Sequence, residues 1–211
     1  MHVDGHSDFF HPGNYDTAAR LGSAAGMDLA LASGRGEMLL THWPEIGGPL
    51  ADDADIVQLG ERDAENPDFD KFYGDIARTG ITQITIQSAL AEGIDSTAHR
   101  VITRLKSRGL NKVWLHVDFD VLDQTVMPAV DSPGSPGLDY EQLGALIGAM
   151  CASGRIVGAD FTIYDPEKDP EACYPSPLVR CIADGVRGRS RAAGPIRLRQ
   201  VDLQHLANWV L

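Results

Sequence analysis

The clearest hydrophobic pattern in the chain is the run Lys112-Val-Trp-Leu-His-Val117, in which apolar and polar residues alternate before an acidic end. A period of two is typical of a β-strand and places His116, Asp118 and Asp120 on one face. Two carboxylates side by side at the end of an apolar strand repel each other unless a positive group lies between them. A metal ion is the usual solution. The pattern therefore predicts a central strand that ends at a metal site.

The rest of the chain alternates between strand-like and helix-like patterns. Short apolar runs predict strands at residues 1–3, 54–59, 82–86 and 155–163. Helical spacing predicts helices at residues 24–32, 68–78, 95–107, 140–152 and 177–185. Because strands that alternate with helices pair in parallel, we predict an α/β fold, a three-layer α/β/α arrangement with a mainly parallel sheet. We interpret residues 1–211 as one domain, with 187–194 as its most linker-like stretch.

Composition and charge exclude several classes of partner. Asp and Glu number 30 against 18 Lys and Arg, and the formal net charge of −12 argues against nucleic acid or an anionic membrane. No apolar run reaches the ~18 residues that span a bilayer. The three cysteines, Cys151, Cys173 and Cys181, lack the paired spacing of a zinc ribbon or disulfide scaffold. We expect a cytoplasmic protein with reduced thiols and a small-molecule substrate.

A second acidic motif has the same construction as the first. Asp4-Gly-His6-Ser-Asp8 follows the short apolar start of the chain, as Asp118-Phe-Asp120 follows the central strand. In parallel α/β sheets ligands bind at the carboxyl ends of strands, so both motifs belong at one edge. Four carboxylates and an imidazole suit hard divalent ions such as Mn²⁺. They exceed what one ion needs, which favours a two-metal site.

The two motifs resemble signatures of the arginase/agmatinase/formiminoglutamase family of ureohydrolases, Asp-Ala-His-x-Asp and Ser-x-Asp-x-Asp before a Pro/Gly loop. The resemblance runs from residue 2 to about residue 186, and Pro128-Ala129 and Gly137 follow at the family spacing. It implies a binuclear Mn²⁺ site and a homo-oligomer, a trimer or hexamer. By this resemblance Asp4 and Asp118 would bridge the ions, Asp8 would complete one shell, and His6 and Asp120 would complete the other.

Three family features are not found at their places in this sequence. The family's sixth ligand is a histidine of a Gly-Gly-Asp-His-Ser motif upstream of the first signature. The first predicted strand, at residues 1–3, is also short compared with the usual ~5–6 residues. We therefore expect the domain to be incomplete at its N-terminus, without its first strands. Ala25 stands where the family has a proton-shuttle histidine, and Ile163 where it has a glutamate that binds the guanidinium. The metal site is thus expected to be better retained than guanidinium recognition.

Further polar residues are candidates for supporting roles. His116 replaces the family serine, and we expect it to hydrogen-bond near the site rather than to ligate. His11 is a candidate proton shuttle, with simple exposure in a loop as the alternative. Asp160 and Asp165 are candidates for substrate binding at the end of a later strand, and Glu61 is a weaker candidate for the rim. The candidate catalytic residues are Asp118, Asp120 and His11.

The sequence supports three hypotheses about function. The first is a manganese-dependent hydrolase that uses a metal-bridging hydroxide on a linear C–N bond of a guanidino, formimino or amide-like substrate. The alternative is a truncated, non-catalytic metal-binding remnant that acts or folds with a partner. The upstream histidine ligand is the feature that separates these two. A deacetylase on the related fold is a weaker third hypothesis, because no paired histidines precede the first acidic motif.

Overall fold

A five-stranded parallel sheet forms the centre of the protein. The computed structural model describes residues 1–14, 24–64, 66 and 75–193. The strands follow the order β3-β2-β1-β4-β5, and every pair is parallel. Their bounds are β1 His2–Val3, β2 Val57–Leu59, β3 Thr82–Ile84, β4 Val113–Asp118 and β5 Ile156–Thr162. This confirms the predicted α/β fold with a mainly parallel sheet.

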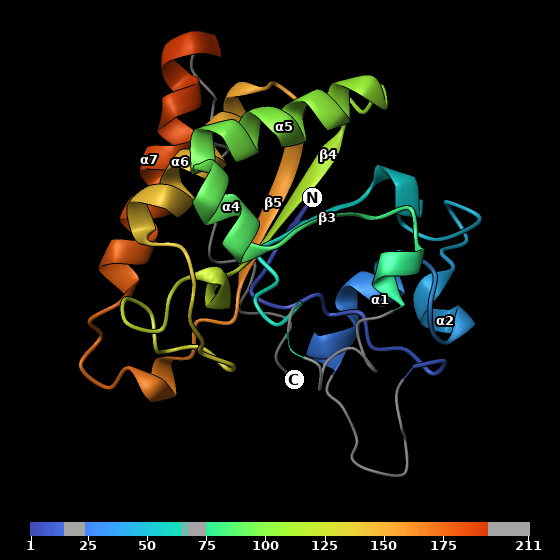
Figure 1. The fold of residues 1–211 in the computed structure, drawn as a ribbon, viewed down its shortest axis with the longest axis horizontal. Coiled ribbons are helices and arrows are strands. Elements are labelled where there is room, and N and C mark those ends of the chain that lie inside the picture. Colours follow the sequence, from blue (N-terminus) through green and yellow to red (C-terminus); the bar gives the residue numbers. More distant parts are fainter. Residues whose placement is uncertain (15–23, 65, 67–74, 194–211) are drawn as a thin grey trace, which may run out of the picture.

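Helices lie on both sides of the sheet (Figure 1). On one side are α4 (Ile86–Glu92), α5 (Ile94–Ser107), α6 (Tyr140–Ala152) and α7 (Pro175–Ala193). Their apolar residues form the larger core together with Val113, Leu115 and Val117 of β4. On the other side lie α1 (Asp28–Ala32), α2 (Met38–Thr41) and the 3-10 turn η1 (Ala24–Met27). A smaller core there includes Phe9 and Leu29.

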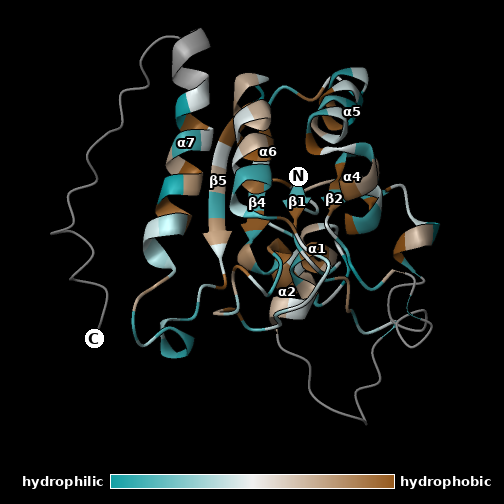
Figure 2. Ribbon diagram, turned by 60° about the vertical axis from the view of Figure 1, so that its left-hand side comes forward, coloured by the Kyte–Doolittle hydropathy of each residue, from teal (hydrophilic) through white to brown (hydrophobic). Residues whose placement is uncertain are grey.

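The sequence of α5 and α6 explains why these helices form and pack. In α5, Val101 and Leu105 are buried while basic residues fill the last turn, and Figure 2 shows both hydrophobic and hydrophilic residues along the helix. A capping box begins α6, because the Asp139 carboxylate accepts from the backbone N–H of Gln142 and the Gln142 side chain accepts in return. Gly185 lets α7 approach α6 closely, since a Cβ there would lie 2.8 Å from Ile147.

Several elements differ from the predicted ones. The helices α2 and α4 were not predicted; Thr85 caps α4 by accepting from the N–H of Ser88 directly after β3. The predicted helix at residues 68–78 falls mostly outside the described residues, and only the 3-10 turn Ile76–Arg78 is described. The linker interpretation was wrong for residues 187–193, which continue α7. Arginine is a good helix former, which favours helix over linker there. The one-domain interpretation stays a prediction.

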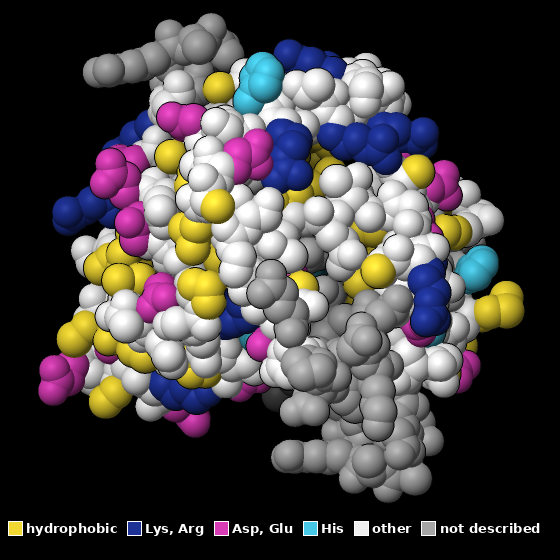
Figure 3. Space-filling model, viewed as in Figure 1, with side chains coloured by type: hydrophobic (Ala, Val, Ile, Leu, Met, Phe, Trp, Pro, Cys, Tyr) yellow, Lys and Arg dark blue, Asp and Glu magenta, His cyan; other side chains and the backbone are white. Residues whose placement is uncertain are grey.

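The surface is acidic overall but not uniformly so. Figure 3 shows Lys and Arg side chains along the upper edge of the molecule, where Figure 1 places α5. Arg100 and Arg108 form ion pairs with Glu92 and Asp55. Among the described residues, no helix combines the length and apolarity that a membrane crossing requires.

Candidate metal centre

The sheet order brings the two acidic motifs together. β1 lies between β2 and β4, with His2 in register with His116 and Val3 in register with Val117. The next residue of the first motif, Asp4, therefore emerges beside Asp118 at the carboxyl edge. The residues of both motifs at this edge are largely buried: Asp4 is 1%, Asp118 5% and Asp120 4% exposed.

Asp4, His6 and Asp120 form the tightest set of donors. His6 Nδ1 lies 2.9 Å from Asp120 Oδ2 and 3.7 Å from Asp4 Oδ1. The N–H of Gly5 donates to Asp120 Oδ1 at 3.0 Å, and the N–H of His6 donates to Asp4 Oδ1 at 2.7 Å. One ligand atom from each of the three residues lies within 4.8 Å of the others. The structure thus joins two motifs that are more than a hundred residues apart in the sequence.

Asp118 and Asp8 flank this set. Asp118 Oδ1 accepts from the N–H of Asp120 at 2.7 Å, which caps the 3-10 turn η4 (Phe119–Val121). Asp8 forms a ligand group with Asp4 and His2, and its backbone has a φ of +43°, a region that Asp tolerates better than most residues. Among the described residues, the groups with ligand atoms within 4.8 Å do not include Asp118. Its bridging role stays a prediction.

Burial and mutual repulsion dominate the electrostatics of the carboxylates. Burial first, and then repulsion from Asp120, raise the pKa of Asp118 to about 8. Burial and the charge of Asp28 raise the pKa of Asp8 to about 7, and burial and Asp8 raise that of Asp4 well above its usual range. Burial is the largest single influence on the pKa of Asp120 and acts to raise it, but the hydrogen bond and charge of His6, the charge of Arg62 and the N–H of Gly5 together lower it. The cluster carries more negative charge than its own cations neutralise.

The donor chemistry of the cluster suits a divalent cation. Asp4 Oδ2 is buried and has no hydrogen-bond partner, although a buried carboxylate oxygen normally has one. The ligand groups that contain Asp4 add the carboxylates of Asp8 and Asp120 and the imidazoles of His2 and His6, and oxygen-rich sites of this kind suit Mn²⁺ better than thiolate-binding metals. The described residues therefore fit a hard metal ion.

Polar residues from β2 and the loop after it support the first motif, and the sequence revealed little of their role. Gln58 Nε2 donates to the carbonyl of His6 at 3.1 Å. Glu61, predicted at the rim, is instead buried and accepts from Ser7 Oγ at 2.5 Å. A side chain at the rim of a site would be exposed, whereas Glu61 is 1% exposed, so the rim interpretation was wrong. Burial raises the pKa of Glu61.

Arg62 is a buried cation that was not predicted as a site residue. It donates to the carbonyl of Asp120, and its Nη1 lies 3.4 Å from the carbonyl of Ser132. Glycine at position 5 leaves room for the guanidinium in this arrangement, since a Cβ on Gly5 would lie 2.2 Å from Arg62 Nη2. The guanidinium thus ties the loop after β2 to the loop after β4. Its signal in the sequence is its place directly after a strand end, beside Gly60 and Glu61.

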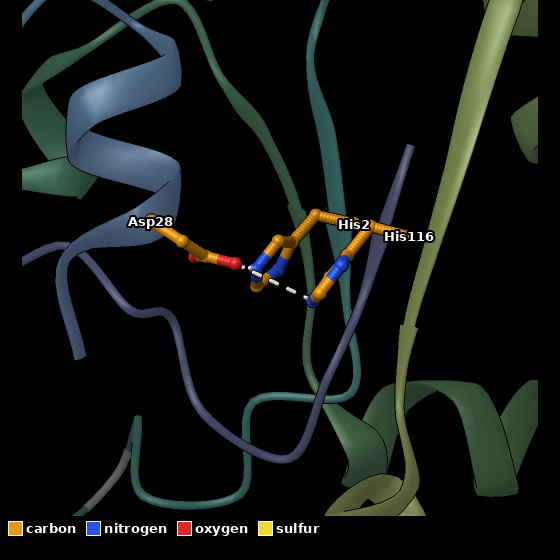
Figure 4. A group of neighbouring side chains, drawn as sticks. All are labelled: His2, Asp28 and His116. Atoms are coloured by element: carbon orange, nitrogen blue, oxygen red, sulfur yellow. Dashed lines mark hydrogen bonds and ion pairs between the residues drawn. The ribbon is translucent and has the colours of Figure 1, made fainter. Parts of the chain in front are cut away.

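A second group of potential ligands lies on the sheet next to the first. His2, Asp28 and His116 point toward one another from β1, α1 and β4 (Figure 4). His116 Nδ1 also lies 2.6 Å from Asp160 Oδ2, in agreement with a hydrogen-bonding role for His116. Asp160 in turn accepts from the Trp114 indole N–H. His2 and Asp28 were not predicted as site residues, because their proximity depends on how α1 packs on the sheet.

The remaining predicted residues lie apart from these ligand groups. His11 Nε2 is 3.7 Å from Asp75, its ring packs edge-on to Phe9, and burial lowers its pKa. Asp165 caps the 3-10 turn η5 (Pro166–Lys168) by accepting from the N–H of Glu167 at 2.9 Å. The roles of His11 as a shuttle and of Asp165 in substrate binding stay predictions.

Ala25 and Ile163, which the resemblance predicts at the places of the family's shuttle histidine and glutamate, offer no comparable chemistry. Ala25 is exposed in η1 and has no group that transfers a proton. Ile163 follows β5 with a φ of +73°, an uncommon region for a β-branched residue, and its side chain cannot pair with a cation.

Comparison with known proteins identifies the class. A sequence model of the Arginase family matches residues 1–179. Formimidoylglutamase from Chromobacterium violaceum is 34% identical over 84 residues, which cover 40% of this chain and 23% of that protein. Formimidoylglutamase from Citrobacter koseri is 31% identical over 87 residues, covering 41% of this chain and 24% of that protein.

Solved structures show the same fold. Arginase from Entamoeba histolytica, in complex with L-ornithine, has a TM-score of 0.69 at 21% identity and covers 88% of this chain and 59% of its own. Arginase from Bacillus caldovelox has a TM-score of 0.69 at 23% identity, covering 92% of this chain and 61% of its own. The chain thus spans about three-fifths of the arginase structures it matches. It belongs to the Arginase family.

Proposed function

We propose that this protein is a metal-dependent hydrolase that uses two Mn²⁺ ions to cleave a linear C–N bond. The observation that carries the proposal is the convergence of Asp4, His6 and Asp120 beside Asp118 at the carboxyl edge of the sheet. The relatives named formimidoylglutamase favour a formimino substrate over a guanidino or amide-like one.

Five residues would hold the ions: Asp4, His6, Asp8, Asp118 and Asp120. When bound, the ions would supply Lewis acidity and make a water molecule a nucleophile near neutral pH. The chain's own groups keep the donors in place for this task. Asp120 Oδ2 accepts from His6 Nδ1 and fixes the orientation of that ring. Gln58 holds the backbone of the first motif through the carbonyl of His6, and Glu61 accepts from the hydroxyl of Ser7. Such support is what lets a site act without reorganising.

A non-catalytic metal-binding protein is the second candidate function. Two observations favour it: Ala25 offers no proton shuttle, and Ile163 offers no anionic partner to a substrate. The two candidates share the metal site and differ in turnover. The predicted homo-oligomer and small-molecule substrate belong to the first candidate.

Metal stoichiometry and turnover together test the proposal. The chelated protein is loaded with Mn²⁺, and bound metal is measured by mass spectrometry after desalting. We expect more than one ion per chain, and ammonia release from a formimino amino acid in preference to urea release from guanidino substrates. Asp118→Ala should abolish turnover, whereas Asp52→Ala, at an exposed position, should not. Fewer than one ion per chain would refute the site; full loading without turnover on any substrate would favour the non-catalytic candidate.

A further inference from the structure

His2, Asp28 and His116 form a cluster that the proposed manganese site does not use as a whole. His2 Nε2 lies 3.2 Å from Asp28 Oδ1, and His116 Nε2 lies 3.4 Å from Asp28 Oδ2. The two imidazole rings stack with centroids 4.8 Å apart and planes inclined by 22°. Figure 4 shows both rings turned toward the same carboxylate. Three ligand atoms therefore converge on one point between α1 and the sheet.

The hydrogen bonding of His116 indicates that a positive charge is needed between His116 Nε2 and the Asp28 carboxylate. Its Nδ1 lies 2.6 Å from Asp160 Oδ2, which requires the proton of a neutral ring to be on Nδ1. The lone pair of Nε2 then faces the Asp28 carboxylate at 3.4 Å, and two acceptors so close repel each other. Either a second proton or a metal cation between them removes the repulsion.

The surroundings of His116 match those of a metal-binding histidine. A ligating histidine almost always donates its other ring N–H to a carboxylate, as His116 does to Asp160. The other histidine, His2, is only 5% exposed, and its Nδ1 is buried without a hydrogen-bond partner. This ring is therefore fixed by packing and has an unsatisfied nitrogen, which is uncommon for a buried polar group.

The site is open to solvent on one side. A pocket of about 580 Å³ is lined by all three residues and by Asp160 and Trp114. A cation would enter by this route, and an outside ligand or water would complete its shell. Two imidazoles and one carboxylate suit Zn²⁺, Co²⁺ or Ni²⁺ better than the harder Mn²⁺.

We propose that His2, Asp28 and His116 bind a second kind of divalent cation, a borderline transition metal such as Zn²⁺, separate from the manganese site. Asp160 is a positioning residue, because it orients His116 without reaching the metal. His2 links the two sites, since its Nε2 also lies 3.5 Å from Asp4 Oδ2. The tighter donor set of Asp4, His6 and Asp120 includes none of the three proposed ligands.

Cobalt titration of the chelated full chain tests this assignment. Co²⁺ bound to imidazole gives a visible absorption band, and competition with Zn²⁺ gives the relative affinity. We expect His116→Gln and Asp28→Asn each to weaken Co²⁺ binding more than tenfold. Asp160→Asn should weaken it by roughly 10–100-fold, the usual effect of a lost partner behind a ligand. His99→Gln, at an exposed histidine of α5, is the matched control and should change nothing.

Asp120→Asn separates this proposal from the proposed function. It should reduce Mn²⁺ loading and leave the cobalt band of the His116 site in place. Unchanged Co²⁺ affinity in His116→Gln would overturn the assignment, and so would loss of the band in Asp120→Asn with retention in His116→Gln. Failure of the unsubstituted chain to load Mn²⁺, with an intact cobalt site, would instead refute only the manganese proposal. Far-UV circular dichroism and thermal melts of Asp28→Asn, at a partly exposed position, check that weaker binding does not reflect unfolding.

Discussion

Replacing Asp118 by asparagine should stabilise the metal-free protein at neutral pH. In the folded chain the pKa of Asp118 rises from 3.8 to about 8, chiefly through burial and then through Asp120. A carboxyl group whose pKa is raised on folding binds its proton more tightly in the folded state. The free energy of unfolding therefore falls as pH increases from about 4 to about 8.

The magnitude follows from the same shift. Each unit of pKa difference corresponds to about 1.4 kcal/mol. An increase in pH from 3.8 to 7 should therefore lower the free energy of unfolding by about 4 kcal/mol through this group. Asparagine resembles the protonated acid, and its side-chain oxygen can still accept from the N–H of Asp120. Because Asp4 and Asp8 retain their own repulsion, a single substitution should recover only part of the loss, about 1–3 kcal/mol.

Urea denaturation of chelated protein at pH 4 and pH 7 measures this effect. We expect Asp118→Asn to be more stable than the wild type at pH 7 and no more stable at pH 4. Asp52→Asn, at an exposed position, should show no such pH-dependent gain. Saturating Mn²⁺ should reverse the order, because ligands that bind only the folded state stabilise it and the variant would bind more weakly. Equal gains at both pH values, or a loss at pH 7, would refute the reasoning.

Two further substitutions test the packing around the site and the start of α6. Gly5→Ala should displace Arg62 and lower the free energy of unfolding by ~1–3 kcal/mol, as overpacking does. Gly48→Ala is the control and should not, because a Cβ there meets nothing within 4 Å. Equal urea denaturation midpoints for the two variants would contradict the close approach of Gly5 and Arg62. Asp139→Ala removes the capping box of α6 and should lower the free energy of unfolding by about 1 kcal/mol, measured by urea denaturation with Asp52→Ala as the control. An unchanged free energy of unfolding would mean that the cap does not stabilise the protein.

The sequence predicted the strands near the site better than the contacts that complete it. Period-two alternation located β4, and the parallel arrangement then placed Asp4 and Asp118 at one edge without further information. The bond between His6 and Asp120 follows from that placement. By contrast, Asp28 reaches His2 only because α1 packs on the sheet. Local sequence patterns carry no information on which residues the packing of a helix on a sheet brings into contact.

The helices that were missed have similar physical causes. α2 is a single turn whose exposed Met38, Leu39 and Leu40 lack the polar face that marks an amphipathic helix. α4 begins two residues after β3 and ends at Gly93, which leaves too short a segment for a helical period to show. Arg62 was missed because the carbonyls that its guanidinium contacts, those of Asp120 and Ser132, are 58 and 70 residues away in the sequence.

The position of β1 in the middle of the sheet has a consequence for how the protein folds. This two-residue strand pairs with β2 and β4, and its partner His116 is more than a hundred residues away in the sequence. Contacts across such long separations form slowly, because the chain must close large loops before they contribute stability. We therefore expect the donor set to assemble late in folding. A metal ion captured at that stage would slow unfolding much more than it would accelerate folding.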